Sequence, residues 1–82
     1  MKAQLIERNG PYGHNTYRIF NGAGEPIGLV TGGGDRKATG RSIWWDWRAN
    51  PTEGDPYGRS GRYCRTKHEA MERLLMAWTS GR

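Results

Sequence analysis

The stretch Ser42–Arg48, which reads S-I-W-W-D-W-R, decides the fold of this chain of 82 residues. Side chains alternate between the two faces of an extended strand, so Ile43, Trp45 and Trp47 share one face. An aromatic side chain buries about 150–250 Å² in a folded protein. We therefore expect this face to lie under another element of the structure.

The opposite face of the same strand carries Ser42, Trp44, Asp46 and Arg48. Trp44 is then the one indole of the stretch that points away from the core. A tryptophan beside an arginine is either a stacking platform for an unpaired base or an anchor in a protein interface. The third alternative is a rim residue covered by a long loop, and the sequence leaves the three open.

A helix at the C-terminal end is predicted to cover the tryptophan face. It begins with the capping box Thr66-Lys67-His68-Glu69, in which the threonine oxygen accepts a backbone hydrogen bond and the glutamate reaches back. Gly81 is a plausible stop. The apolar positions between them recur at helical spacing and are Ala70, Met71, Leu74, Leu75, Ala77 and Trp78.

Four further segments read as strands from their alternation and their β-branched and aromatic residues. They are Ala3–Arg8, Asn15–Phe20, Ile27–Thr31 and Arg62–Arg65. In the strand Ala3–Arg8, the side chains of Ala3, Leu5 and Glu7 should share a face. In the strand Ile27–Thr31, Gly28 suggests a bulge or the close approach of another backbone. We predict a single α+β domain over residues 1–82, with an antiparallel sheet of three to five strands packed on one C-terminal helix.

The composition favours a polyanionic partner. The formal net charge is +5, from 13 basic and 8 acidic residues, and ten of the basic residues are arginine. Arginine presents a planar fork that suits phosphate, and the basic balance favours a polyanionic partner such as nucleic acid. The alternative is that the charge serves solubility alone.

The single cysteine cannot form a disulfide within the chain, and one cysteine with two histidines is too few for a zinc site. No cofactor or metal is therefore expected. The sequence shows neither an apolar leader nor a run of 18 apolar residues, so we expect a cytoplasmic protein without membrane contact.

Two basic segments are the candidate binding sites. Arg59, Arg62 and Arg65 recur every third residue in a segment without carboxylates, a spacing suited to a phosphate backbone. The glycine-rich segment 32–41 supplies a second cluster, although its glycines lack the spacing of a P-loop. The predicted binding residues are Arg36, Lys37, Arg41, Trp44, Arg48, Arg59, Arg62 and Arg65.

Catalysis is not expected. Cys64 and His68 are the one nucleophile-and-base pairing in the sequence, and no third residue is placed to orient them. A cysteine that faces the core is the preferred interpretation.

The segment that reads G-R-Y-C-R-T-K-H-E-A resembles small DNA-binding domains built from a three-stranded sheet backed by one helix. Examples are plant ethylene-response-factor domains and the arm-site-binding domains of tyrosine integrases. Tyr63, Thr66, Glu69 and Ala70 match the family pattern at the start of the backing helix. The resemblance implies that the sheet enters the major groove, with its candidate readers being Arg18, Trp44, Asp46 and Arg48. The extra N-terminal strand and the long segment Ala49–Gly61 depart from that family.

The sequence thus predicts a non-enzymatic module that binds nucleic acid, duplex or single-stranded, through an arginine-rich surface. A small protein rich in tryptophan and arginine also resembles the accessory proteins that bacteriophages encode, including anti-CRISPR inhibitors. The alternative function is therefore an inhibitor or adaptor that binds a nucleic-acid-handling protein complex, with Trp44 as its anchor.

Overall fold

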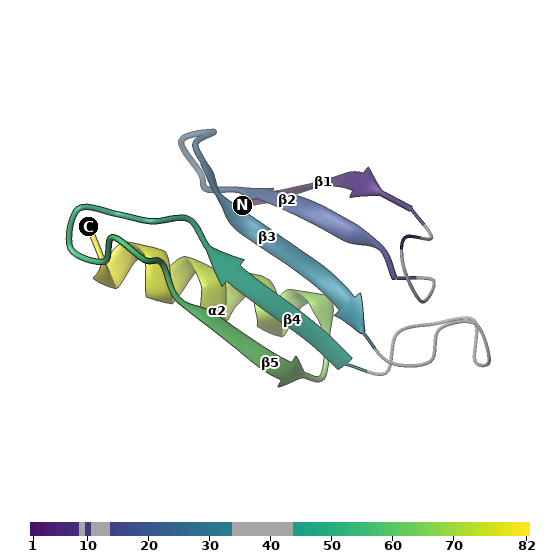
Figure 1. Cartoon of the computed structure of the whole chain (residues 1–82). Coiled ribbons are helices and arrows are strands. Elements are labelled where there is room, and N and C mark those ends of the chain that lie inside the picture. The colour runs from purple at the N-terminus through teal and green to yellow at the C-terminus, as the bar shows by residue number, and fades with distance from the viewer. Residues whose placement is uncertain (9, 11–13, 34–43) are drawn as a thin grey trace.

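The structure, a computed structural model, describes residues 1–8, 10, 14–33 and 44–82. It contains a five-stranded antiparallel sheet with one helix packed against it (Figure 1), which confirms the predicted α+β fold. The strands lie in chain order, so the sheet is a simple meander. The elements are β1 Lys2–Glu7, β2 Thr16–Phe20, β3 Pro26–Gly33, β4 Trp44–Ala49, β5 Ser60–Cys64 and α2 Lys67–Ser80.

Two strands extend beyond their predicted bounds. β5 begins at Ser60, inside the segment expected to be a loop. β3 continues through Gly32 and Gly33, which pair with Trp45 and Trp44 of β4. A side chain at Gly33 would collide with the Trp44 indole. Glycine is therefore favourable here, because it leaves room for the ring across the strand pair.

The predicted facing of β1 is correct for Ala3 and Leu5 and wrong for Glu7. A register shift between Leu5 and Glu7 places Glu7 opposite Thr16, whereas Leu5 lies opposite Tyr17. A bulge inserts one extra residue into a strand and so reverses the alternation beyond it. Glu7 consequently lies on the face that Ala3 and Leu5 do not use.

The centre of the core is aliphatic. Ile19, Ile27, Val30 and Leu74 are fully buried between the sheet and α2. Trp45 and Trp47 turn toward the helix as predicted, but both are half-buried and pack against the margin of this core. The deepest residues come instead from β2, β3 and α2, so the tryptophan face lies under the helix as predicted but beside the most buried part of the core. Ile43 and Ser42 lie outside the described residues.

Gly28 confirms the predicted irregularity in the third strand. The register of β2 and β3 shifts between Ile19 and Phe20, beside Gly28. A methyl group at Gly28 would overlap the carbonyl oxygen of Arg48 and press on the Leu74 side chain. The close packing of β3, β4 and α2 thus requires glycine at this position.

The capping box forms as predicted at its threonine, whereas its glutamate bonds the residue before the N-cap. The Thr66 hydroxyl oxygen accepts a hydrogen bond from the Glu69 backbone N–H at 3.0 Å. A Glu69 carboxylate oxygen accepts from the backbone N–H of Arg65, also at 3.0 Å. That hydrogen bond is the main cause that lowers the pKa of Glu69, and Arg73 contributes further. Its stabilising effect is present at neutral pH and is lost as acid protonates the carboxylate.

Thr66→Ala should lower the thermal midpoint of unfolding by about 4–8 °C. Loss of a threonine N-cap costs about 1 kcal/mol, and 1 kcal/mol shifts the midpoint of a domain of this size by about that amount. Thr79→Ala, at an exposed position in the last turn of the same helix, is the matched control and should leave the midpoint at or slightly above that of the wild type. Equal midpoints for the two variants in a circular-dichroism melt would contradict the capping role.

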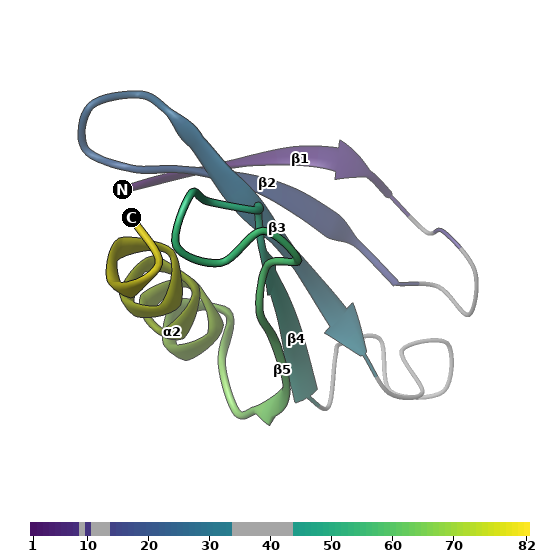
Figure 2. The ribbon, with the colours of Figure 1, turned by 60° about the vertical axis from the view of Figure 1, so that its left-hand side comes forward.

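The helix covers only part of one face of the sheet. α2 contacts β3, β4 and β5, and Figure 2 shows β1 and β2 extending away from it. No described element covers the opposite face, which we call the open face. It is the surface on which the outward side chains of all five strands stand.

Candidate nucleic-acid interface

A row of side chains crosses the middle of the open face. The strand registers place Gln4 opposite Arg18, Arg18 opposite Leu29, Leu29 opposite Arg48, and Arg48 opposite Ser60. Residues directly opposite one another in an antiparallel sheet share a face. Arg18 and Arg48 are exposed, and their strands are separated by two strand spacings, or about 10 Å. The half-buried Leu29 lies between them.

A shallow hollow of about 460 Å³ extends this row toward β5. Arg48 and Arg62 line it together with Leu29, Thr31 and Asp46. Arg62 is exposed, and it comes from the strand that pairs with the strand of Arg48. The open face therefore gathers three arginines from β2, β4 and β5.

These three arginines differ from Arg59 and Arg73, which form ion pairs with nearby carboxylates. Among the described residues, no carboxylate forms an ion pair with Arg18, Arg48 or Arg62. Arg59 Nε, by contrast, lies 2.8 Å from an Asp55 carboxylate oxygen.

The helix itself carries paired charges. Arg73 Nε is 3.3 Å from a Glu69 oxygen, and His68 Nε2 is 2.8 Å from a Glu72 oxygen. The open face thus carries three arginines without an ion pair among the described residues, beside the acidic residues Glu7 and Asp46.

An aromatic pair stands at one end of the open face. The Trp44 and Tyr63 ring centroids are 5.6 Å apart, with the ring planes tilted by 59°. Trp44 is half-buried, since its indole also lies over Gly33. Tyr63 is 68% exposed. The predicted outward direction of Trp44 is confirmed, but its neighbour presents the more accessible ring.

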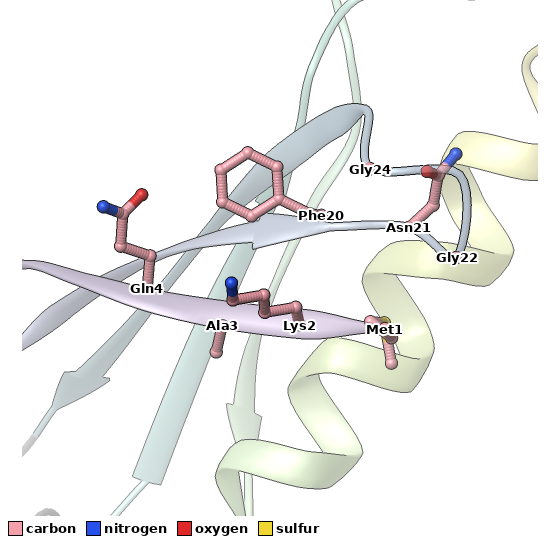
Figure 3. Close-up of a pocket in the computed structure, with 8 residues that line it drawn as sticks. All are labelled: Met1, Lys2, Ala3, Gln4, Phe20, Asn21, Gly22 and Gly24. Carbon is pink, nitrogen blue, oxygen red and sulfur yellow. The ribbon is translucent and has the colours of Figure 1, made fainter.

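Phe20 adds an aromatic ring at the other end. It lies opposite Lys2 in the β1–β2 register, and both line a hollow of about 580 Å³ near the turn that follows β2. Figure 3 shows the Phe20 ring on the same side of the strands as Lys2 and Gln4, with Ala3 pointing the other way. Aromatic rings therefore lie on both sides of the arginine row, Phe20 toward one end of the strands and Trp44 with Tyr63 toward the other.

The structure separates the arginines that the sequence grouped by spacing. Arg62 lines the open-face hollow, whereas Arg59 lines a hollow between β4 and α2 with Glu69 and Arg73. The backbone N–H of Arg65 bonds to Glu69 at the start of the helix. The period of three does not form a stripe, because side chains three residues apart on an extended chain point to opposite faces, as Arg59 and Arg62 do. Arg36, Lys37 and Arg41 lie outside the described residues.

The cysteine and the histidine have separate environments. Cys64 is buried in the core, as the sequence pattern favoured, and burial raises the pKa of its thiol. His68 pairs with Glu72 on the surface of the helix. A buried, protonated thiol is a poor nucleophile, so these two residues do not suggest a catalytic pair.

Two residues of the open face were not among the predicted binding residues. Phe20 was predicted only as part of a strand, whereas Tyr63 was a match at the start of the helix and a tyrosine that could extend an aromatic and basic surface. Strict alternation along Asn15–Phe20 places Phe20 on the same face as Arg18, so the sequence pattern could have predicted that Phe20 lies beside the arginines. The direction of the Tyr63 side chain depends on a bulge in β5, which the alternation pattern does not predict.

No protein-family model matches this chain, and comparison with curated proteins and with solved structures finds no significant match. Within the described ranges, no three His, Cys, Asp or Glu side chains are grouped so that they could hold a metal ion. The described helix, α2, has 14 residues and is too short and too polar to cross a membrane.

Proposed function

We propose that this protein binds nucleic acid through the open face of its sheet. The observation that carries the proposal is the convergence of Arg18, Arg48 and Arg62, all exposed and without ion pairs among the described residues, on a sheet face that no described helix covers. Phosphate contacts from such cations fix the position of a nucleic acid without reading its sequence.

The shape of the surface supports this proposal. Arg48 stands two strands from Arg18 and one strand from Arg62, so the three guanidinium groups can contact phosphates along one chain. Leu29 between Arg18 and Arg48, and the aromatic rings on both sides of the row, offer surfaces for bases and sugars. The sequence resemblance to sheet-docking DNA-binding domains implies the same face, with Arg18, Trp44, Asp46 and Arg48 as its candidate readers.

Binding should weaken steeply with salt. Each phosphate that is neutralised contributes about −0.9 to the log–log slope on duplex and about −0.7 on single strands. Three arginines therefore predict slopes of about −2.7 and about −2.1, respectively, measured by fluorescence anisotropy with labelled oligonucleotides across a salt series. Lack of binding to both probes at low salt would contradict the proposal. That result would favour the alternative, an inhibitor or adaptor with a protein partner.

A further inference from the structure

Tyr63 has an unusual backbone conformation. Its φ is +65°, and it is the one non-glycine residue with positive φ in the described ranges. This left-handed region is unfavourable for bulky L-residues. Such strain persists only where the surrounding structure maintains it, and it often marks a functional position.

A β-bulge produces this conformation. Trp45 pairs with Cys64 and Trp47 pairs with Gly61. Asp46 on β4 is therefore opposed by two residues of β5, Arg62 and Tyr63. An Asp46 carboxylate oxygen accepts a hydrogen bond from the Tyr63 backbone N–H at 3.3 Å. Bulges of this kind redirect a side chain and are frequent beside functional sites.

The bulge directs the tyrosine to the open face and not into the core. Cys64, the next residue, fills the core position. The Tyr63 ring contacts Trp44 at a tilt and remains 68% exposed. Glycine would adopt this backbone with less strain. Stability alone therefore gives little reason for an aromatic residue at this position.

We propose that Tyr63 is the stacking residue for an unpaired base, so that the open face prefers single-stranded over duplex nucleic acid. This inference rests on the proposed function. Trp44 supports the ring from one side, and Arg62 and Arg48 lie in the adjacent hollow, where they can contact the phosphates next to the stacked base. Bases in a duplex stack on one another, so Tyr63 contributes little to duplex binding.

The test compares Tyr63→Ala and Tyr63→Phe with the wild type. The probes are a fluorescein-labelled oligo(dT) strand of about 20 nucleotides, longer than the usual site of one domain, and a duplex of equal length. Tyr63→Ala should weaken binding to the single strand by roughly 5- to 150-fold, the range typical for the loss of one base–aromatic stack. It should change duplex binding by less than about twofold. Tyr63→Phe should bind both probes as the wild type does, because phenylalanine retains the ring.

Two controls separate this role from a structural one. Tyr57→Ala removes a tyrosine that is 95% exposed and lies in the segment between β4 and β5, and it should bind both probes normally. Tyr63→Gly removes the ring and relieves the positive φ. Tyr63→Gly should lose as much affinity for the single strand as Tyr63→Ala does. Its thermal midpoint of unfolding should be higher than that of Tyr63→Ala, because glycine adopts positive φ with less strain.

The outcomes distinguish this inference from the proposed function. Salt-dependent binding of the wild type with unchanged single-strand affinity in Tyr63→Ala would overturn the role of Tyr63 and leave the proposed function standing. Equal weakening on both probes would also overturn the single-strand preference. No binding by the wild type would overturn both proposals.

Discussion

Replacing Arg18, Arg48 and Arg62 together by alanine should lower the affinity for nucleic acid by about 100-fold or more at low salt. Each charge-assisted phosphate contact contributes at least about 1 kcal/mol, so the loss of three removes at least about 3 kcal/mol of binding. The salt slope should fall nearly to zero, because few counterions remain to be released. Fluorescence anisotropy across a salt series measures both quantities.

The matched control for this variant is the triple replacement of Arg59, Arg65 and Arg73 by alanine. Both variants lower the net charge from +5 to +2, so they differ only in which surface loses its cations. The control breaks exposed ion pairs of Arg59 and Arg73, which contribute little to stability. It should retain most of the affinity. Equal losses in the two variants would show that binding follows net charge and not the open face.

Gly28→Ala should destabilise the fold by about 3 kcal/mol, at the upper end of the range for overpacking a core. The added methyl group would meet the carbonyl oxygen of Arg48 and the Leu74 side chain. Backbone atoms of a paired strand cannot move aside as a flexible side chain can. The thermal midpoint should fall by about 12–24 °C, measured by circular dichroism.

Gly22→Ala is the control for this substitution. Gly22 is exposed, and an added methyl group there would meet nothing within 4 Å. Its effect should stay within about 1 kcal/mol and should be neutral or stabilising, since alanine restricts the unfolded chain. A Gly28→Ala protein as stable as Gly22→Ala would show that β3 and β4 can separate without cost.

The helix was the element most fully predictable from sequence. Thr66 and Glu69 are three residues apart and satisfy backbone groups within one turn, so they act wherever the helix packs. Its buried residues also agree with the 3.6-residue period, as Leu74 and Trp78 show. These features depend on neighbours in the chain and need no knowledge of the tertiary structure.

The candidate site was predictable only in part. Alternation placed Trp44 and Arg48 on one face, and that face is indeed the one opposite the helix. The bulges in β1 and β5 were not predictable, because a single extra residue leaves no composition signal and reverses the facing of the residues beyond it. Glu7 and Tyr63 therefore lie where alternation alone does not place them.

By itself, the sequence determined one sheet, one capped C-terminal helix, and an inward direction for Trp45 and Trp47, since local periodicity and local hydrogen bonds specify all three. Only the tertiary structure decided that Arg18, Arg48 and Arg62 share a surface while Arg59 lies on the other side. The physical reason is that strand order and register bring distant residues together, and pairing across strands depends on partners that no local pattern identifies.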